Sequence, residues 1–430
     1  MLGPDTHARL LLIVAVAWTV NFFSATVGGD GLLYYSYLKG KPTNLAPGTA
    51  LFTLPFYAAS LPLHGIVHYR DDAYIALQGD TFVHSLFFSI GLTAYSLAGL
   101  MLVYAMCKRY SSGRIAFQTA LAVFFGTLWV FYSDSTIWPS QPVSVFFVAA
   151  TLYAWQVWRG SGDKKKHAII GLLAASSALV RYETVTIFIP LLIWYVLRKR
   201  SGLVPFVASF SAIVATLLFF WWGVIRINSL GSTPYGNIST TGVVPFLYAF
   251  YALFNPDHGL LWFHPILILA ITGLILLYGR EKELALMSAS FFLALLLGVD
   301  LADNLIFKSY NIGQYCFSAR FLITTVPPLS LGLMEVIRRF RTRSVSIAIF
   351  VLTGFSLFLA MGWTFSISHG NVADIGKNYV SDYFFPIITG SVTVAQLVHG
   401  IDYASKLPLY ALPIWAASIA LVIVRGLKRN

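Results

Sequence analysis

The sequence predicts an all-α polytopic membrane protein with about twelve transmembrane helices. The first observation behind this fold class is the composition: hydrophobic residues make up 57% of the 430 residues and charged residues only 11%. Soluble domains usually carry about 25% charged residues. So little charge cannot cover the surface of a soluble protein of this size. The composition therefore excludes a soluble enzyme, a disordered chain and a disulfide scaffold.

The second observation is the recurrence of long apolar stretches along the whole chain. A spanning helix needs about 20 mainly apolar residues. We assign spans to residues 9–27, 82–105, 115–133, 141–158, 167–181, 184–197, 202–226, 259–278, 284–300, 317–336, 343–363 and 407–424. The stretches 167–181 and 184–197 are short, which leaves tilted spans, partial spans or a tight hairpin open. Residues 45–63 form a further apolar stretch that three prolines interrupt, and we interpret it as an interfacial segment.

The third observation is the distribution of lysine and arginine, which sets the orientation. With both termini in the cytoplasm, 20 of the 29 basic residues fall on the inner side. They are Arg9, Lys108, Arg109, Arg114, Arg159, Lys164, Lys165, Lys166, Arg198, Lys199, Arg200, Arg280, Lys282, Arg338, Arg339, Arg341, Arg343, Arg425, Lys428 and Arg429. The opposite orientation would place this basic excess outside, so we reject it. The net charge of +12 therefore reflects topology and does not indicate nucleic-acid binding.

The loops divide unevenly between the two sides of this single transmembrane domain, residues 1–430. The inner loops are short, whereas the long outer loops cover residues 28–81, 227–258, 301–316 and 364–406. Long loops on one face of a compact body usually carry function. We therefore expect an extracytoplasmic site in a chain of the cell membrane, plasma or inner.

The first outer loop contains the strongest candidate for a catalytic group. Asp30 follows the first span and lies between Gly29 and Gly31, with Tyr34 and Tyr35 one turn further on as candidate substrate-binding residues. Partial desolvation near the membrane raises the basicity of a carboxylate, which suits a general base toward a hydroxyl. The same glycine-rich sequence also suits an ordinary turn, and the residues alone leave both readings open.

Further polar residues of the outer loops are candidate substrate contacts. Asp71 and Asp72 are adjacent, so they suit a cation or a second acid site, although such pairs are more often solvated or cap a helix. His258 is a candidate ligand or proton carrier, and the alternative is a helix cap or a packing residue. Tyr315 lies in the outer loop that leads into the span at 317–336.

Two arginines lie at the outer ends of predicted spans. Arg320 lies at the outer start of the span at 317–336, where a guanidinium group beside lipid requires an anion. A lipid phosphate is a suitable anion, because the N–H groups of a guanidinium bind two phosphate oxygens at once. Arg181 lies with Glu183 between the two short spans, where charges are costly without partners. The alternative is that Arg181 and Glu183 simply pair with each other.

Several chemical signatures are missing from the sequence. It contains no glycine-rich phosphate loop, no Gly-x-Ser-x-Gly motif, no His-Glu-x-x-His motif and no clustered cysteine and histidine. The sequence therefore gives no firm cofactor, and a divalent metal has no support. Charged residues deep within the spans are also missing, which disfavours a proton-coupled transporter.

These residues together resemble a known family, the GT-C integral-membrane glycosyltransferases that use polyprenyl-phosphate sugars, such as protein mannosyltransferases and aminoarabinose transferases. The resemblance depends on short motifs: Gly29-Asp30-Gly31 after the first span, Pro47-Gly48 leading to Leu54-Pro55-Phe56-Tyr57, Ala178-Leu179-Val180-Arg181-Tyr182-Glu183, Asp257-His258-Gly259-Leu260-Leu261, and Ser318-Ala319-Arg320-Phe321-Leu322 before Pro327-Pro328. The pattern departs from the family in three places. Gly31 replaces a second acid, Ala319 stands where glycine is usual, and Ser140-Gln141-Pro142 replaces a Ser-His pair.

The resemblance implies a specific activity and specific roles. Asp30 would be the catalytic base of an inverting sugar transfer, Arg320 and Arg181 would bind the donor phosphate, and His258 would lie near the site. The implied partners are a lipid-linked sugar donor, membrane lipids and a lipid or glycan acceptor, with a protein acceptor less expected and no nucleic acid. The alternatives are a flippase-like transporter of lipids or glycans, an outer-face glycan ligase or polymerase, and a receptor without activity.

Overall fold

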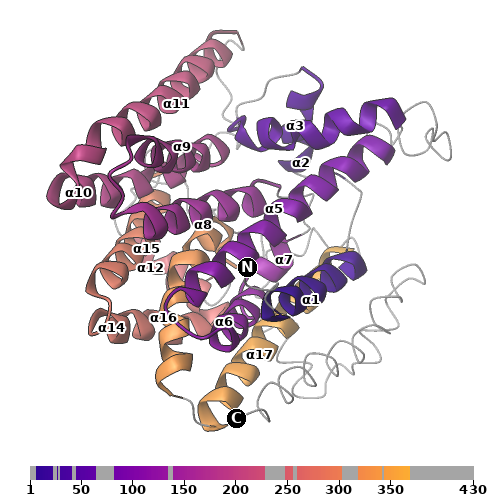
Figure 1. Cartoon of the computed structure of the whole chain (residues 1–430). Helices are drawn as coiled ribbons and strands as arrows, with labels where there is room; N and C mark the ends of the chain where they lie inside the picture. Colours follow the sequence, from indigo (N-terminus) through magenta and orange to yellow (C-terminus); the bar gives the residue numbers. More distant parts are fainter. Residues whose placement is uncertain are drawn as a thin grey trace.

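The computed structural model describes residues 6–22, 27, 30–40, 45–63, 82–133, 139–227, 247–254, 259–302, 318–340 and 343–368. All regular elements within these ranges are helical (Figure 1). In chain order they are α1 (Thr6–Phe22), α2 (Asp30–Leu38), α3 (Gly48–Ser60), η1 (Leu61–Leu63), α5 (Phe82–Lys108), α6 (Gly113–Phe125), α7 (Trp129–Tyr132), α8 (Ser140–Trp158), α9 (Lys164–Val180), η2 (Tyr182–Ile187), α10 (Phe188–Arg198), α11 (Arg200–Ile227), α12 (Leu247–Phe254), α13 (Leu260–Phe263), α14 (Ile266–Tyr278), α15 (Lys282–Ala302), η4 (Arg320–Thr325), α16 (Val326–Arg339) and α17 (Arg343–Ser368). The predicted all-α class is thus confirmed for the described residues.

The described helices agree with the predicted apolar stretches, although not all are equally long. Within the described residues, three segments are long and apolar enough to cross a membrane: Val83–Lys108, Lys282–Val299 and Arg320–Arg339. Other apolar helices, such as α6 and α14, are shorter. The predicted stretch 407–424 lies outside the described residues, so the count of twelve spans stays a prediction.

The outer surface of the helical body is apolar, as in a protein that faces lipid. On α15, Leu286, Leu293 and Leu297 are exposed and recur at the spacing of one helix face. Leu295 and Phe291 lie on the opposite face of the same helix and are buried. Exposed leucines in register along a helix are unfavourable in water, so this surface fits a lipid environment.

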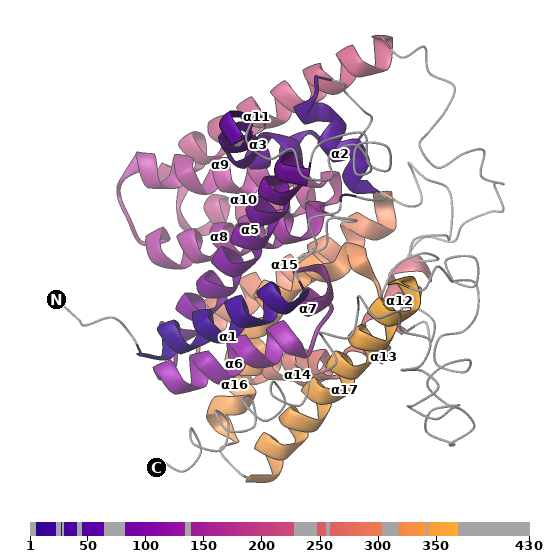
Figure 2. The same cartoon turned by 90° about the vertical axis from the view of Figure 1, so that its right-hand side faces the viewer.

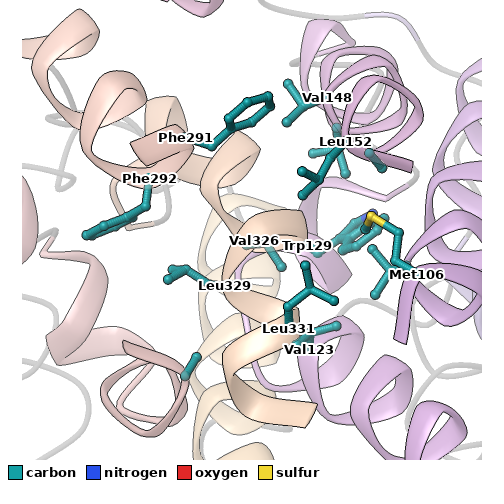
Figure 3. Packing of buried hydrophobic residues seen from close by; sticks show 14 of the residues in the cluster. Met106, Val123, Trp129, Val148, Leu152, Phe291, Phe292, Val326, Leu329 and Leu331 are labelled. Carbon is teal, nitrogen blue, oxygen red and sulfur yellow. The ribbon is translucent and has the colours of Figure 1, made fainter. Parts of the chain in front are cut away.

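α16 lies at the centre of the body, and most of the segment Arg320–Arg339 is buried. Figure 3 shows Val326 and Leu331 of α16 among side chains of α5, α6, α8 and α15. α16 crosses α14 closely because both helices have glycine at the crossing point. A Cβ atom at Gly273 would lie 1.9 Å from the carbonyl oxygen of Gly332. Close packing of this kind through small residues is typical of membrane helices.

The segments predicted to face the cytoplasm meet at one end of the body. Arg280, between α14 and α15, donates to the backbone oxygen of Tyr110 at 3.1 Å and lies 3.3 Å from Glu335 of α16. At the same end, Arg159 after α8 pairs with Glu283 of α15 at 2.7 Å. These contacts agree with the alternation of inner and outer loops that the sequence predicts.

Among the described residues, the segments predicted to lie on the outer side include the short helices α2, α3 and α12. α3 has 13 residues, too few to span a membrane, and its Leu51 and Leu54 are exposed. This length agrees with the expected interfacial segment, because a spanning helix needs about 20 residues. Figure 2 shows α2, α12 and α13 at the right-hand side of the body.

Candidate arginine site at the outer ends of α9 and α16

The structure brings the two predicted phosphate-binding arginines together. Arg181 caps the C-terminal end of α9, and Arg320 begins η4, the 3₁₀ turn that leads into α16. The Cζ atom of Arg181 lies 4.8 Å from the ring centroid of Phe321, and that of Arg320 lies 4.9 Å from the same centroid. Both arginines are buried, with 5% and 8% of their surfaces exposed. Two guanidinium groups therefore converge on one aromatic ring, which stabilises each of them by a cation–π contact.

Arg181 also has a carboxylate partner. Its Nε donates to Oε1 of Glu183 at 2.5 Å, and its Nη2 contacts the same oxygen. The pairing that the sequence left open as an alternative is therefore confirmed. An ion pair in this buried position reduces the cost of burying the charge of Arg181.

An unusual backbone conformation precedes Arg320. Ser318 has φ 54°, the one non-glycine residue with a positive φ in the described part of the chain. The next residue, Ala319, has φ −76° and ψ 73°, and the N–H of Arg320 donates to the carbonyl oxygen of Ser318 at 2.9 Å. These angles and this hydrogen bond form an inverse γ-turn. A left-handed serine costs conformational energy, and such strain concentrates at functional sites.

α2 contributes tyrosines close to the Arg181 segment. Burial raises the pKa of the Tyr182 phenol, and the neighbouring Tyr37, Tyr34 and Glu183 raise it further. Those electrostatic effects require α2 to lie beside η2. Tyr37 is held in place because its hydroxyl donates to the backbone oxygen of Leu45 at 2.6 Å. The candidate substrate residue Tyr34 therefore lies near Tyr182, the residue between Arg181 and Glu183.

Asp30 is the first residue of α2 and lies one helical turn before Tyr34. α2 is thus the element that carries both the predicted base and the tyrosine near Tyr182. The side chain of Asp30 is outside the described part of the structure. Its role as a base stays a prediction.

Tyr35 lies in a different environment from Tyr34. Its ring packs edge-on against Phe88 and Tyr57, with centroid separations of 5.4 and 5.7 Å, and the ammonium of Lys39 lies 5.2 Å from its centroid. These contacts give Tyr35 a packing role between α2, α3 and α5. The sequence assigned it to the substrate, and this role stays a prediction.

α3 packs directly on the backbone that leads into Arg181. A Cβ atom at Gly48 would lie 2.5 Å from the carbonyl carbon of Leu179 and 2.6 Å from the nitrogen of Val180. Only glycine permits this approach without moving a backbone. The Pro47-Gly48 motif of the sequence therefore joins the interfacial helix to the arginine site.

The remaining predicted site residues lie outside the described part of the chain: Asp71, Asp72, His258 and Tyr315. Among the described residues, no group of three or more histidine, cysteine, aspartate or glutamate side chains is placed to hold a metal ion. Sequence reasoning assigned no role to Ser318 and Phe321. Both were visible in the motif around Arg320, but a left-handed serine and a shared aromatic ring follow only from the coordinates.

Comparison with known proteins adds no assignment. No protein-family model matches the chain, and no curated protein matches it either. Any functional argument therefore depends on the residues of this site.

Proposed function

We propose that this chain is an integral-membrane glycosyltransferase of the GT-C type, with its active site on the extracytoplasmic face of the cell membrane. It transfers a sugar from a polyprenyl-phosphate donor to a hydroxyl group of a lipid or glycan acceptor. The observation that carries the proposal is the convergence of Arg181 and Arg320 on Phe321. Glu183 balances the charge of Arg181, so the two buried guanidinium groups and this carboxylate together keep a net positive charge, which attracts an anion such as the phosphate of a lipid.

The proposed reaction is a single inverting displacement. Asp30 accepts the proton of the acceptor hydroxyl while the oxygen attacks the anomeric carbon of the sugar. The bond between that carbon and the phosphate oxygen breaks, and the lipid phosphate leaves with both bonding electrons. Arg181 and Arg320 stabilise the additional negative charge on the phosphate. Because phosphate already leaves well, the protein contributes mainly position and charge.

Other features of the described residues agree with this chemistry. Asp30 begins α2, and Tyr34 of the same helix lies near Tyr182, which follows Arg181 in the chain. A base and a phosphate site on neighbouring elements would flank a sugar. The apolar surface of α15 and the exposed leucines of α3 support a protein that takes both substrates from the membrane.

The test is the turnover of the full chain in proteoliposomes, supplied with a panel of polyprenyl-phosphate hexoses and pentoses. Release of the polyprenyl phosphate reports transfer whichever sugar is used. We expect Asp30→Asn to lower turnover by about 10²–10⁴-fold, because the base is lost while the shape is kept. The matched control is Asp163→Asn. Asp163 caps α9 at the other end of that helix by accepting from Lys165 N at 2.9 Å, and asparagine caps equally well.

Two results would contradict the proposal. Near-normal turnover in Asp30→Asn, with Asp163→Asn also normal, would remove Asp30 as the base. Movement of the intact lipid-linked sugar across the membrane, without release of lipid phosphate from any donor, would favour a transporter instead.

A further inference from the structure

The hydroxyl of Ser318, two residues before Arg320, is buried without a hydrogen-bond partner among the described residues. Ser318 is fully buried, and its Oγ has no hydrogen-bond partner within the described ranges. Buried hydroxyl groups are almost always hydrogen-bonded, because a polar group loses its water on burial. Ser288 of α15 also has a buried hydroxyl without a partner among the described residues, so the position of Ser318 beside Arg320, together with the missing hydrogen bond, is what points to a ligand.

The backbone around Ser318 places this hydroxyl close to Arg320. The inverse γ-turn at Ala319 reverses the chain, so the N–H of Arg320 is 2.9 Å from the carbonyl oxygen of Ser318. The side chains of residues 318 and 320 thus start from adjacent points of one tight turn. From there, the guanidinium of Arg320 reaches the Phe321 ring that it shares with Arg181.

The same serine is held in an unfavourable conformation. A φ of 54° is adopted readily by glycine, whereas a residue with a Cβ atom incurs a cost. Ser318 thus combines two unfavourable features, a strained backbone and a hydroxyl without a partner among the described residues, which indicates a role other than stability. Glycine would remove both penalties at once, and a functional requirement for the hydroxyl would explain why serine is present.

We propose that the Ser318 hydroxyl is a third ligand of the anion at this site, and that it donates a hydrogen bond to a phosphate oxygen beside Arg320. This inference rests on the proposed function, since it assumes that the anion is the phosphate of the lipid donor. The left-handed backbone holds the serine hydroxyl in place before the anion binds. A group positioned in advance loses little conformational entropy on binding, so it adds affinity and orientation.

The experiment measures binding of farnesyl phosphate to the purified full chain in detergent micelles, with farnesol as the probe that lacks the anion. Ser318→Ala removes the hydroxyl and keeps the Cβ atom, whereas Ser318→Gly removes the hydroxyl and relaxes the backbone. We expect both variants to bind farnesyl phosphate about 10- to 100-fold more weakly, as for the loss of a hydrogen bond to a charged group. Binding of farnesol should not change.

A control variant separates this effect from the removal of any buried hydroxyl. Ser288 of α15 is also fully buried with an unbonded Oγ, and it lies near the other end of the body, close in sequence to Glu283. Ser288→Ala should bind farnesyl phosphate as the unaltered protein does. Thermal melting should show that neither alanine variant is destabilised, because no native hydrogen bond is lost, and that Ser318→Gly melts at the same or a higher temperature.

The outcomes distinguish this inference from the proposed function. If Arg320→Ala weakens farnesyl phosphate binding and the Ser318 variants do not, the phosphate site stands and the role of Ser318 is wrong. If Ser318→Ala weakens binding but Ser318→Gly does not, the backbone matters and the hydroxyl does not, which also overturns the inference. If the unaltered protein binds farnesyl phosphate no better than farnesol, the phosphate site and the inference fall together.

Discussion

The crossing of α14 and α16 permits a quantitative prediction at Gly332. A Cβ atom there would lie 2.0 Å from the carbonyl oxygen of Ala270 and 2.8 Å from the nitrogen of Leu274. Cβ atoms in proteins essentially never come within 3.0 Å of a heavy atom to which they are not covalently connected. The atoms in the way belong to the backbone of α14 and cannot rotate aside. Gly332→Ala therefore forces the two helices apart by about 1 Å, and the close packing across the crossing is lost.

The free-energy balance of this substitution has two opposing terms. Alanine favours the helix over glycine by about 1 kcal/mol. Overpacking of a well-packed interior costs about 1–3 kcal/mol, occasionally more. Because both helices meet through rigid backbone, we expect a cost near the upper end of this range. We expect a net loss of about 2 kcal/mol in the free energy of unfolding. Since 1 kcal/mol changes Tm by about 2–4 °C in a domain of 150–250 residues, Tm should fall by several degrees.

The assay is thermal melting of the full chain in detergent, with Gly354→Ala as the matched control. Gly354 lies in α17, and a Cβ atom there would meet nothing within 4 Å, so this variant should keep or raise Tm. Because η4 continues directly into α16, displacement of α16 should also move Arg320 and weaken binding of farnesyl phosphate. If Gly332→Ala melts at or above the temperature of Gly354→Ala, the reasoning from close helix approach is refuted.

Two further predictions concern the ends of the body. Phe321→Leu keeps an apolar side chain but removes the ring that contacts both guanidinium groups. Each cation–π contact contributes about 0.5–2 kcal/mol, so the loss of the two contacts that position the arginines should weaken binding of farnesyl phosphate by about fivefold or more. Unchanged affinity would contradict the shared-ring site. At the other end, Glu335 is 1% exposed and pairs with both Arg338 and Arg280, at 2.6 and 3.3 Å. Glu335→Gln should lower the free energy of unfolding by about 2 kcal/mol, since the two partly exposed arginines lose the buried carboxylate that accepts their charge-assisted contacts. Glu283→Gln should cost about 1 kcal/mol or less, because the Glu283 side chain is 41% exposed and exposed ion pairs contribute little; equal losses in the two variants would show that burial is not the deciding factor.

The helical class and most helix positions follow from the sequence, because apolar stretches of spanning length have few alternatives to helix in a membrane. α5, α8 and α15 begin or end within a few residues of the predicted limits. The prediction treated residues 317–336 as one span, whereas the structure has a 3₁₀ turn, η4, before α16. Hydropathy responds to apolar side chains and is insensitive to how the backbone bends among them.

Part of the candidate site was also accessible from the sequence. A buried arginine near a membrane is costly, so Arg181 and Arg320 are conspicuous wherever they lie in the fold. The pairing of Arg181 with Glu183 was foreseeable as an alternative because only one residue, Tyr182, lies between them in the chain. The contact of both arginines with Phe321 could not be foreseen. Arg181 and Arg320 lie 139 positions apart in the chain, and hydropathy contains no information on distances between residues.

The sequence by itself determined what kind of protein this is: scarce charge and repeated apolar stretches require helices with apolar surfaces, and the lysines and arginines predict which loops share a side. Only the tertiary structure decided which residues meet. The approach of α3 to Leu179 through Gly48, the two arginines on Phe321, and the strained Ser318 with its buried hydroxyl all depend on backbone distances of a few ångströms. Such distances result from the packing of whole helices, and a residue's own neighbours in the chain do not encode them.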